Sequence, residues 1–261
     1  MNWIDSHCHL NYDYSPKSVD QIIEEALRAG VSSMITVGTD LAMLDAMVAI
    51  SEKYPQVYHT VGVHPHEAIT LQPGDLERIK KAASHPKCRA IGEIGLDYHY
   101  DHSPREVQIQ QLESQLDLAL EVGLPVIIHS REAEEDLLNS LRSYSKKVPA
   151  GKIPGVIHCF SGTSEFGRAC IDLGFYISFS GIITFKTAES IRACAAEFPL
   201  DRILVETDSP YLAPAPNRGK KCEPSMVTLT GKKLAEVRGM FAEDIARITT
   251  ENSRRFFNLP A

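Results

Sequence analysis

The chain has 261 residues, of which 43% are hydrophobic and 23% are charged, and its formal net charge is −7. This composition is ordinary for a globular protein in water, and the acidic balance argues against a surface that coats nucleic acid without specificity. No run of 18 apolar residues occurs, and the first residues lack the basic and apolar segments of a leader peptide, so we predict a cytoplasmic protein without a membrane partner. The six cysteines follow no disulfide or Cys-x-x-Cys pattern, which favours reduced thiols.

Short apolar runs alternate with amphipathic segments along the whole chain. Eight runs are typical of buried strands, near residues 3–6, 33–37, 57–61, 89–93, 126–129, 156–158, 176–179 and 203–207. Helical periodicity separates them, for example over 19–29, 42–53, 76–83, 105–121 and 133–144, and Gly30, Gly123 and Gly174 follow such helices at a left-handed cap position. Two more helical stretches, 225–237 and 242–257, come after the last strand. Eight β-then-α units without a linker or repeat predict an α/β fold, a TIM (β/α)₈ barrel forming one domain over residues 1–261, with C-terminal helices packed outside or beneath it.

The first predicted strand runs into two histidines, His7 and His9. Successive side chains of a strand point to opposite faces, so Asp5, His7 and His9 project to the same side. Two imidazoles that converge in this way can hold a transition-metal ion, with Asp5 or a backbone carbonyl orienting the other ring nitrogen. An isolated His-x-His pair is more often part of a core, so the interpretation depends on the rest of the chain.

Other ionisable residues stand at the equivalent position, the carboxyl end of a predicted strand. Glu93, His129 and His158 end the fourth, fifth and sixth strands, and Asp208 follows the eighth. Active sites of TIM barrels are built at this end of the barrel. We therefore predict that six side chains meet in one metal site: His7, His9, Glu93, His129, His158 and Asp208.

Four imidazoles and two carboxylates exceed the needs of one tetrahedral ion and suit two divalent cations that share a carboxylate. Glu93 is the predicted bridge. One ion would take His7, His9, Glu93 and Asp208, and the other Glu93, His129 and His158. Such a pair can activate water for a displacement, and Asp208 could also accept the proton of that water. Mixed nitrogen and oxygen ligands admit zinc, manganese, magnesium or nickel.

Side chains near the predicted site indicate an anionic substrate. Arg131 follows the fifth strand, His64 ends the third, and Arg218 lies with two lysines in the loop after the eighth. An arginine beside such a site can clamp a phosphate with two hydrogen bonds, whereas an apolar wall would favour neutral amides or lactones. Asp97 and Glu206 are predicted to support the metal ligands.

Six stretches of the chain resemble the TatD family of metal-dependent deoxyribonucleases, within the amidohydrolase-like superfamily. They are DSHCHL at 5–10, GVHPHE at 62–67, GEIGLDYH at 92–99, PVIIHSR at 125–131, IHCFSG at 157–162 and ETDSPYLAPAPNRGK at 206–220. The resemblance implies a TIM barrel with two divalent cations on the six side chains named above. It also implies hydrolysis of phosphodiester bonds in DNA, typically as a 3′ to 5′ exonuclease on single strands. Family members commonly carry Asn-Glu-Pro where this chain reads Cys222-Glu223-Pro224, so an amide that would position this loop is replaced by a thiol.

We therefore expect a metal-dependent deoxyribonuclease, a monomer whose partner is single-stranded DNA. An alternative is an amidohydrolase-type enzyme that cleaves a small amide, lactone or ester. Many dinuclear members of that group bridge their ions with a carboxylated lysine, whereas the fourth strand here ends in Glu93. A third hypothesis is a metal-stabilised barrel that binds without turnover, although structural metal sites are usually closed and four-coordinate.

Overall fold

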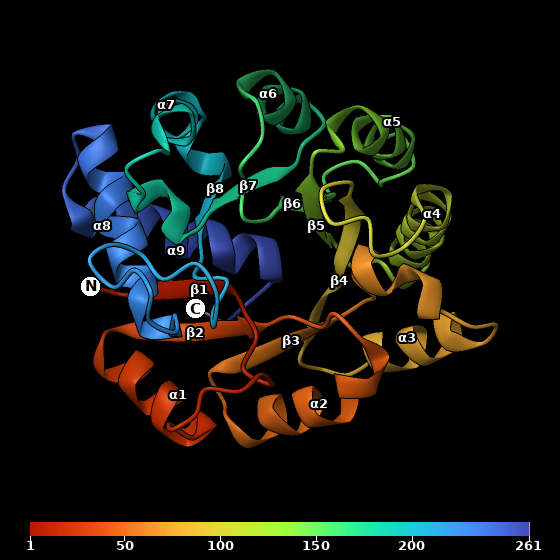
Figure 1. Cartoon of the computed structure of the whole chain (residues 1–261), viewed down its shortest axis with the longest axis horizontal. Helices are drawn as coiled ribbons and strands as arrows, with labels where there is room; N and C mark the ends of the chain where they lie inside the picture. Colours follow the sequence, from red (N-terminus) through yellow and green to blue (C-terminus); the bar gives the residue numbers. More distant parts are fainter. Residues whose placement is uncertain (261) are drawn as a thin grey trace.

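The computed structural model describes residues 1–260, so Ala261, the last residue of the predicted domain, lies outside the described residues. Eight parallel strands form one sheet in chain order, and a bridge between Cys8 and Ser209 links its first and last edges. The strands are β1 (Trp3–Cys8), β2 (Val31–Thr36), β3 (Val57–Val61), β4 (Cys88–Asp97), β5 (Val126–Arg131), β6 (Gly155–Ile157), β7 (Tyr176–Phe179) and β8 (Ile203–Val205). The sheet nearly closes on itself, which confirms the predicted TIM barrel (Figure 1).

Helices surround the strands in the order of the chain (Figure 1). They are α1 (Val19–Arg28), α2 (Leu44–Lys53), α3 (Asp75–Ala83), α4 (Arg105–Val122), α5 (Glu134–Ser145), α6 (Ser164–Asp172), α7 (Glu189–Glu197), α8 (Val227–Arg238) and α9 (Ala242–Phe257). Short 3₁₀ turns are η1 (Leu41–Met43), η2 (Pro65–Thr70), η3 (Gly181–Thr184), η4 (Leu200–Arg202) and η5 (Pro224–Met226). The helix ends follow local chemistry: Ser18 and Gln21 form a capping box on α1, and Gly123 ends α4 with a φ of 69°. None of these helices, over residues 1–260, is long and apolar enough to span a membrane.

Strands β1 and β4 each contain an irregularity that shapes the site. β4 extends to Asp97, so Glu93 lies inside the strand, where the register of β4 against β5 shifts between Ile91 and Ile94. The register of β1 against β2 shifts in the same way between Asp5 and Cys8. Such irregularities re-aim side chains, and they fall where His7 and Glu93 turn into the barrel mouth.

The interior of the barrel is filled from its amino-terminal end. A cluster of buried side chains lines the inside of the strands and includes the end of α9: Ile35, Val37, Tyr58, Ala90, Ile127, Val156, Tyr176, Leu204, Phe256 and Phe257. The Asn252 side chain on α9 donates hydrogen bonds to the carbonyls of Leu200 and Ile203 at the start of β8. As predicted, a C-terminal helix therefore packs beneath the barrel, and the opposite end is left open for polar side chains.

Candidate metal centre

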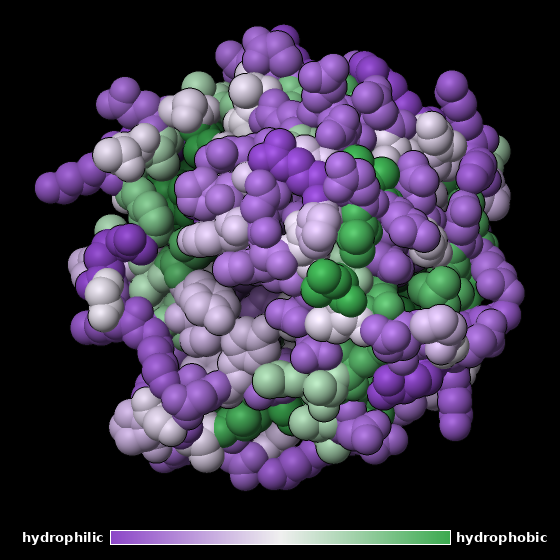
Figure 2. All heavy atoms as spheres, turned by 45° about the vertical axis from the view of Figure 1, so that its right-hand side comes forward, coloured by the Kyte–Doolittle hydropathy of each residue, from purple (hydrophilic) through white to green (hydrophobic). Residues whose placement is uncertain are grey.

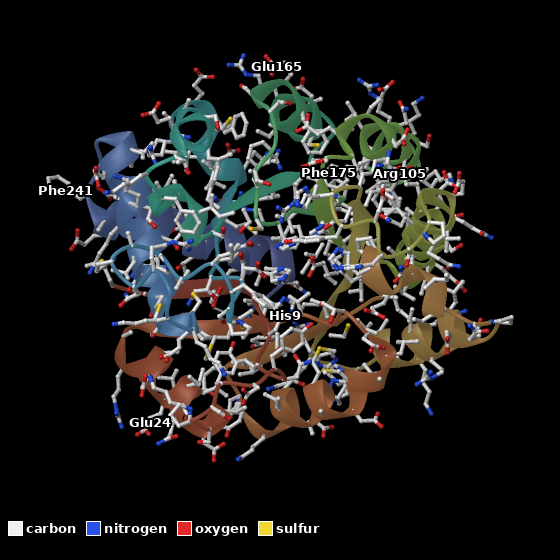
Figure 3. All side chains as sticks on the ribbon, viewed as in Figure 1. His9, Glu24, Arg105, Glu165, Phe175 and Phe241 are labelled. Atoms are coloured by element: carbon white, nitrogen blue, oxygen red, sulfur yellow. The ribbon has the colours of Figure 1, made fainter. Side chains whose placement is uncertain are left out.

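His9 lies near the centre of the view along the barrel, whereas Glu24, Glu165 and Phe241 point outward at the periphery (Figure 3). The face in Figure 2 is mostly hydrophilic, with apolar side chains scattered over it. A hollow of about 470 Å³ opens at the carboxyl ends of the strands. It is the size of a small-molecule site and holds the polar side chains that the sequence assigns to the barrel mouth.

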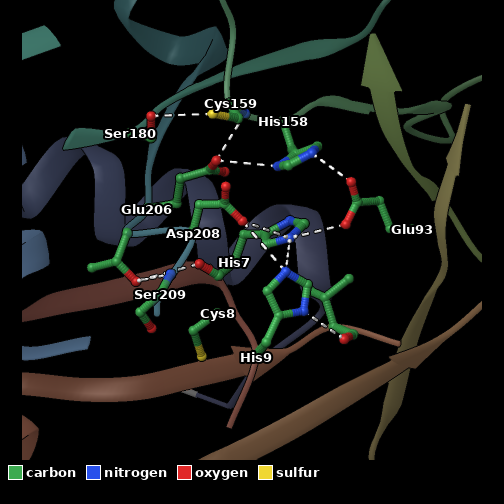
Figure 4. Close-up of polar contacts among 12 residues, drawn as sticks. His7, Cys8, His9, Glu93, His158, Cys159, Ser180, Glu206, Asp208 and Ser209 are labelled. Carbon is green, nitrogen blue, oxygen red and sulfur yellow. Dashed lines mark hydrogen bonds and ion pairs between the residues drawn. The ribbon is translucent and has the colours of Figure 1, made fainter. Parts of the chain in front are cut away.

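Two imidazoles at the end of β1 meet a carboxylate from the loop after β8 (Figure 4). The Nε2 atoms of His7 and His9 are 3.3 Å apart, and Asp208 Oδ1 lies 3.6 Å from the first and 3.4 Å from the second. His9 directs Nδ1 at the carbonyl of Val37, 3.1 Å away, so Nδ1 carries the hydrogen and Nε2 presents a lone pair. Three electron-pair donors therefore face one point.

Glu93 joins this group to a second set of histidines. Its Oε2 lies 3.3 Å from His7 Nε2. Its Oε1 lies 2.8 Å from His158 Nε2, 3.1 Å from His129 Nδ1 and 3.3 Å from His64 Nε2. The two oxygens of one carboxylate thus face two different clusters of nitrogen donors.

This donor set fits divalent cations. Ligands bound at about 2.1 Å around a tetrahedral ion are about 3.4 Å apart, close to the separations among His7, His9 and Asp208. His158 Nε2 is buried and has no hydrogen-bond partner, because its short approach to Glu93 lacks the direction of a hydrogen bond. Three groups of side chains each bring their donor atoms within 4.8 Å of one another: His7, His9 and Asp208; His7, Glu93 and His158; His64, Glu93 and His129. His158 thus groups with His7 here, whereas the sequence paired it with His129.

Two further carboxylates orient the histidines, and both were predicted as supports. Asp97 Oδ2 lies 3.0 Å from His129 Nε2 and 2.9 Å from His66 Nε2. Glu206 Oε1 lies 3.3 Å from His158 Nδ1. An ionised carboxylate can only accept a hydrogen bond, so the ring nitrogen that points at Asp97 or Glu206 carries the hydrogen. The other ring nitrogen, which faces Glu93, can then act as a metal ligand.

Asp5 has a different role from the predicted one. Its carboxylate accepts hydrogen bonds from the Thr207 amide at 2.9 Å and from the Thr207 hydroxyl at 2.6 Å, rather than from a histidine ring. The Asp208 amide donates to the carbonyl of His7 at 2.9 Å. Because β8 runs beside β1, Asp5 reaches the loop that carries Asp208 and positions that loop.

The charges of the cluster depend on one another. Burial by itself raises the pKa of Glu93, but the surrounding imidazoles, chiefly that of His158, lower this pKa well below its usual range. Burial likewise raises the pKa of Asp208, but the neighbouring imidazoles, chiefly that of His9, turn this into a net lowering. Both carboxylates are therefore ionised at neutral pH, the form that binds a cation.

The three predicted substrate contacts lie in different surroundings. His64 caps η2 and lies within the cluster, where burial lowers its pKa to about 4, so it is a neutral donor rather than a cation. Arg131 lines the hollow, with its guanidinium 4.9 Å from the centre of the Tyr100 ring. Arg218 does not line it, because its guanidinium packs 3.6 Å from the Phe185 ring and donates to the carbonyl of Ala213.

The two lysines that follow Arg218 do not line the hollow either. Lys221 forms an ion pair with Asp13 at 2.8 Å. The predicted convergence of positive charge at the barrel mouth is therefore reduced, within the described residues, to Arg131. Side chains of a loop can satisfy their charge locally, on an aromatic ring or a neighbouring carboxylate, and their order in the sequence does not reveal this.

Sequence reasoning missed the aromatic rim of the hollow. Tyr12 stacks on His9 with ring centres 4.8 Å apart, and Tyr211 meets Tyr12 edge to face at 6.2 Å. The Tyr211 side chain is 55% exposed, and Tyr100 opposite is 52% exposed. A signal was available, because each tyrosine follows a carboxylate or histidine of the site by three residues.

Two cysteines lie near the candidate ligands. Cys159 follows His158, and strand alternation would turn its side chain away from the hollow, yet it lines the hollow, because β6 ends at Ile157 and Cys159 takes a φ of 45°. Cys222 is buried under the loop of Asp208, with its Sγ 3.9 Å from the carbonyl of Thr207 and its amide donating to Pro210. The thiol at position 222 thus packs beneath the loop.

Known proteins resemble this chain over its whole length. The family described as TatD related DNase matches residues 4–258. The uncharacterized metal-dependent hydrolase YabD of Bacillus subtilis is 41% identical over 255 residues, 98% of each chain. The 3′-5′ ssDNA/RNA exonuclease TatD of Erwinia tasmaniensis is 34% identical over 249 residues, which covers 93% of this chain and 95% of that protein. The crystal structure of a TatD homolog from Escherichia coli superposes with a TM-score of 0.91 at 32% identity, covering 99% of this chain and 98% of that one.

Proposed function

This chain belongs to the TatD-related DNase family of metal-dependent hydrolases, and we propose that it is a two-cation nuclease that removes nucleotides from the 3′ end of single-stranded DNA. The relative from Erwinia tasmaniensis, which is named a 3′-5′ ssDNA/RNA exonuclease, supports the direction and the single-stranded substrate. We propose that residues 1–261 act as one domain and as a monomer. The free cysteines fit action in the reducing cytoplasm.

One observation carries the proposal: the two oxygens of Glu93 face different nitrogen clusters. A bridging carboxylate of this kind suits two cations. In this assignment His7, His9, Glu93 and Asp208 would hold one cation, and Glu93, His129 and His158 would hold the other. When bound, two divalent cations neutralise charge on the transferring phosphate and lower the pKa of water.

The side chains around the cations divide the remaining work. Asp208 is ionised and lies at the edge of the hollow, so it can accept the proton of the attacking water. Arg131 can hold a phosphate oxygen of the scissile bond. Tyr12 and Tyr211 offer ring faces on which a terminal base can stack, an interaction that tolerates any sequence.

The test uses DNA oligonucleotides labelled at either end, with magnesium, manganese, zinc or nickel added to metal-stripped protein. A 3′ label should appear at once in mononucleotide, whereas a 5′ label should shorten stepwise. His129→Ala and Glu93→Ala should abolish both patterns, and Glu24→Gln, an exposed glutamate on α1, should leave them unchanged. Labelled RNA is tested in parallel, because the Erwinia relative is named an exonuclease of both single-stranded DNA and RNA. Wild-type protein that leaves every labelled strand intact with all four metals would refute the nuclease assignment.

A neutral substrate is the second candidate, favoured by the apolar side chains Ile182 and Leu212 in the wall of the hollow. A small lactone, ester or amide would pack there without needing a cation clamp. Turnover of such a compound faster than of any phosphodiester would favour this function. If the protein binds cations stoichiometrically and turns over neither class of substrate, it is a binding barrel without catalysis.

A further inference from the structure

A second hollow lies at the amino-terminal end of the barrel, opposite the metal centre. Its volume is about 630 Å³, and it is bounded by the ends of α4 and α9 and by the segments that lead into several strands. Figure 1 shows α9 behind the ring of strands. The two hollows share no lining residue. The volume lies within the range of small-molecule sites, so this end of the barrel can hold a ligand of its own.

Positive charge is concentrated around this second hollow. Its lining includes Arg89, Lys152, Arg202 and Arg255, and no carboxylate lines it among residues 1–260. Of these four, only Arg202 has an ion pair in the described part of the chain, with its neighbour Asp201 at 3.9 Å. In a chain with a net charge of −7, four cations of which three have no ion pair within residues 1–260 make a local site of attraction for anions.

Buried polar atoms at the hollow lack partners. Tyr176 is fully buried and lines the hollow, and its hydroxyl has no hydrogen-bond partner. The Nε of Arg89 is also buried without a partner. Buried polar groups in folded proteins are nearly always hydrogen-bonded. A ligand that offers acceptor oxygens would satisfy both atoms.

Aromatic rings form another part of the wall. Tyr176 meets Phe256 with ring centres 5.6 Å apart, and Phe257 packs on Phe256 at 4.5 Å. The guanidinium of Arg202 lies 5.4 Å from the centre of the Tyr176 ring. An arginine placed on a ring in this way keeps its hydrogens free for an oxyanion. The wall therefore combines a polar corner for an anion with an apolar surface for a ring.

We propose that this hollow binds a phosphomonoester that carries a ring, of which a nucleoside monophosphate is the model ligand. The phosphate oxygens would accept hydrogen bonds from Arg89, Arg202 and Arg255, and the Tyr176 hydroxyl would donate to the same group. The base or sugar would pack against Phe256. Arg255 also lies in the last turn of α9, where a cation offsets the helix dipole, but that role does not account for Arg89 and Arg202, which precede or begin strands.

The test is calorimetric titration of the whole protein with deoxyadenosine monophosphate, inorganic phosphate and deoxyadenosine. The monophosphate should bind, and the double variant Arg202→Gln/Arg255→Gln should weaken binding about tenfold or more. Arg168→Gln removes an exposed arginine on α6 and should leave the affinity unchanged. Tyr176→Phe should weaken binding without lowering the melting temperature of the free protein, because the lost hydroxyl has no partner there.

Two further arms separate this site from the metal centre and identify the ligand. Glu93→Gln should leave the affinity for the monophosphate unchanged, whatever happens to nuclease activity. Binding that is lost in Glu93→Gln but kept in the double arginine variant would place the ligand at the metal centre and overturn the proposal, as would equal binding of deoxyadenosine and its monophosphate. Inorganic phosphate that binds as tightly as the nucleotide would support the anion site and identify free phosphate as its ligand.

Discussion

Replacing Asp97 with asparagine tests how the metal ligands are oriented. Oδ2 of Asp97 accepts from His129 and His66, and Oδ1 accepts from the backbone amides of His99 and Tyr100 at 3.0 and 2.9 Å. The amides are fixed donors, so the oxygen of an asparagine must face them. Its NH₂ group then faces the two imidazoles, and each ring must accept through Nε2. The hydrogen of His129 consequently moves to Nδ1, the atom 3.1 Å from Glu93.

The expected effects of Asp97→Asn on stability and on metal binding differ in size. All four hydrogen bonds keep a partner, so the free energy of unfolding of the metal-free protein should fall by only about 1–2 kcal/mol, the loss of charge assistance. Metal affinity should fall about 10- to 100-fold, because a ring nitrogen that carries hydrogen cannot ligate. That loss corresponds to about 1.4–2.7 kcal/mol of binding free energy.

The assay for Asp97→Asn is competition titration of zinc against a coloured chelator, with ¹⁵N spectra of the histidines to report the tautomers. Asp136→Asn is the matched control, since Asp136 accepts from the exposed Tyr98 hydroxyl and contacts no histidine. If Asp97→Asn binds zinc within about threefold of wild type, or if His129 keeps its hydrogen on Nε2, the assigned role of Asp97 is wrong.

Three other substitutions probe stability and substrate binding. Burial and the nearby charge of His85 lower the pKa of His59 to about 4, so the folded protein favours the neutral imidazole. The contribution of neutral His59 to the free energy of unfolding is complete above the unfolded pKa of about 6.5 and is lost as pH falls toward 4. Urea unfolding should therefore show that wild type loses about 2 kcal/mol more than His59→Gln between pH 7.5 and pH 5. Tyr211→Ala should raise KM for single-stranded DNA about tenfold with little change in kcat, if one base stacks there; an unchanged KM would exclude that role. Gly231→Ala places a Cβ 2.1 Å from the Trp3 ring and should destabilise the fold by about 1–3 kcal/mol in the same unfolding assay, whereas a gain in stability would contradict the close packing of α8 on β1.

The distribution of positive charge bears on both proposals. The loop after β8 contains Arg218 and two lysines, yet these side chains make local contacts, and Arg131 alone of the predicted cations lines the metal centre. Meanwhile four cations gather at the other end of the barrel, around a hollow that no carboxylate lines among residues 1–260. If the protein is the proposed nuclease, one arginine at its mouth leaves most of the phosphate affinity to bound cations, so we expect DNA binding to depend strongly on metal.

The barrel and the six candidate ligands were accessible from the sequence for one physical reason. Parallel strands all end at the same edge of a barrel, so residues such as His7, Glu93 and Asp208 share a location once the strands are recognised. Local patterns sufficed for this, because strand alternation and helix caps depend on neighbours in the chain. The glycine caps and the C-terminal helix over 242–257 were predicted within a residue or two on the same basis.

Only the tertiary structure decided which atoms meet. The register shifts in β1 and β4 turn His7 and Glu93 toward each other, and no pattern of residues announces such a shift. How the loops fold back over the barrel decides that His64 lies beside Glu93 and that Arg218 packs on the Phe185 ring instead of lining the hollow. These contacts join residues that are far apart in the chain. They are determined by how the folded chain packs and by which polar groups find partners nearby, and neither is visible in a local sequence pattern.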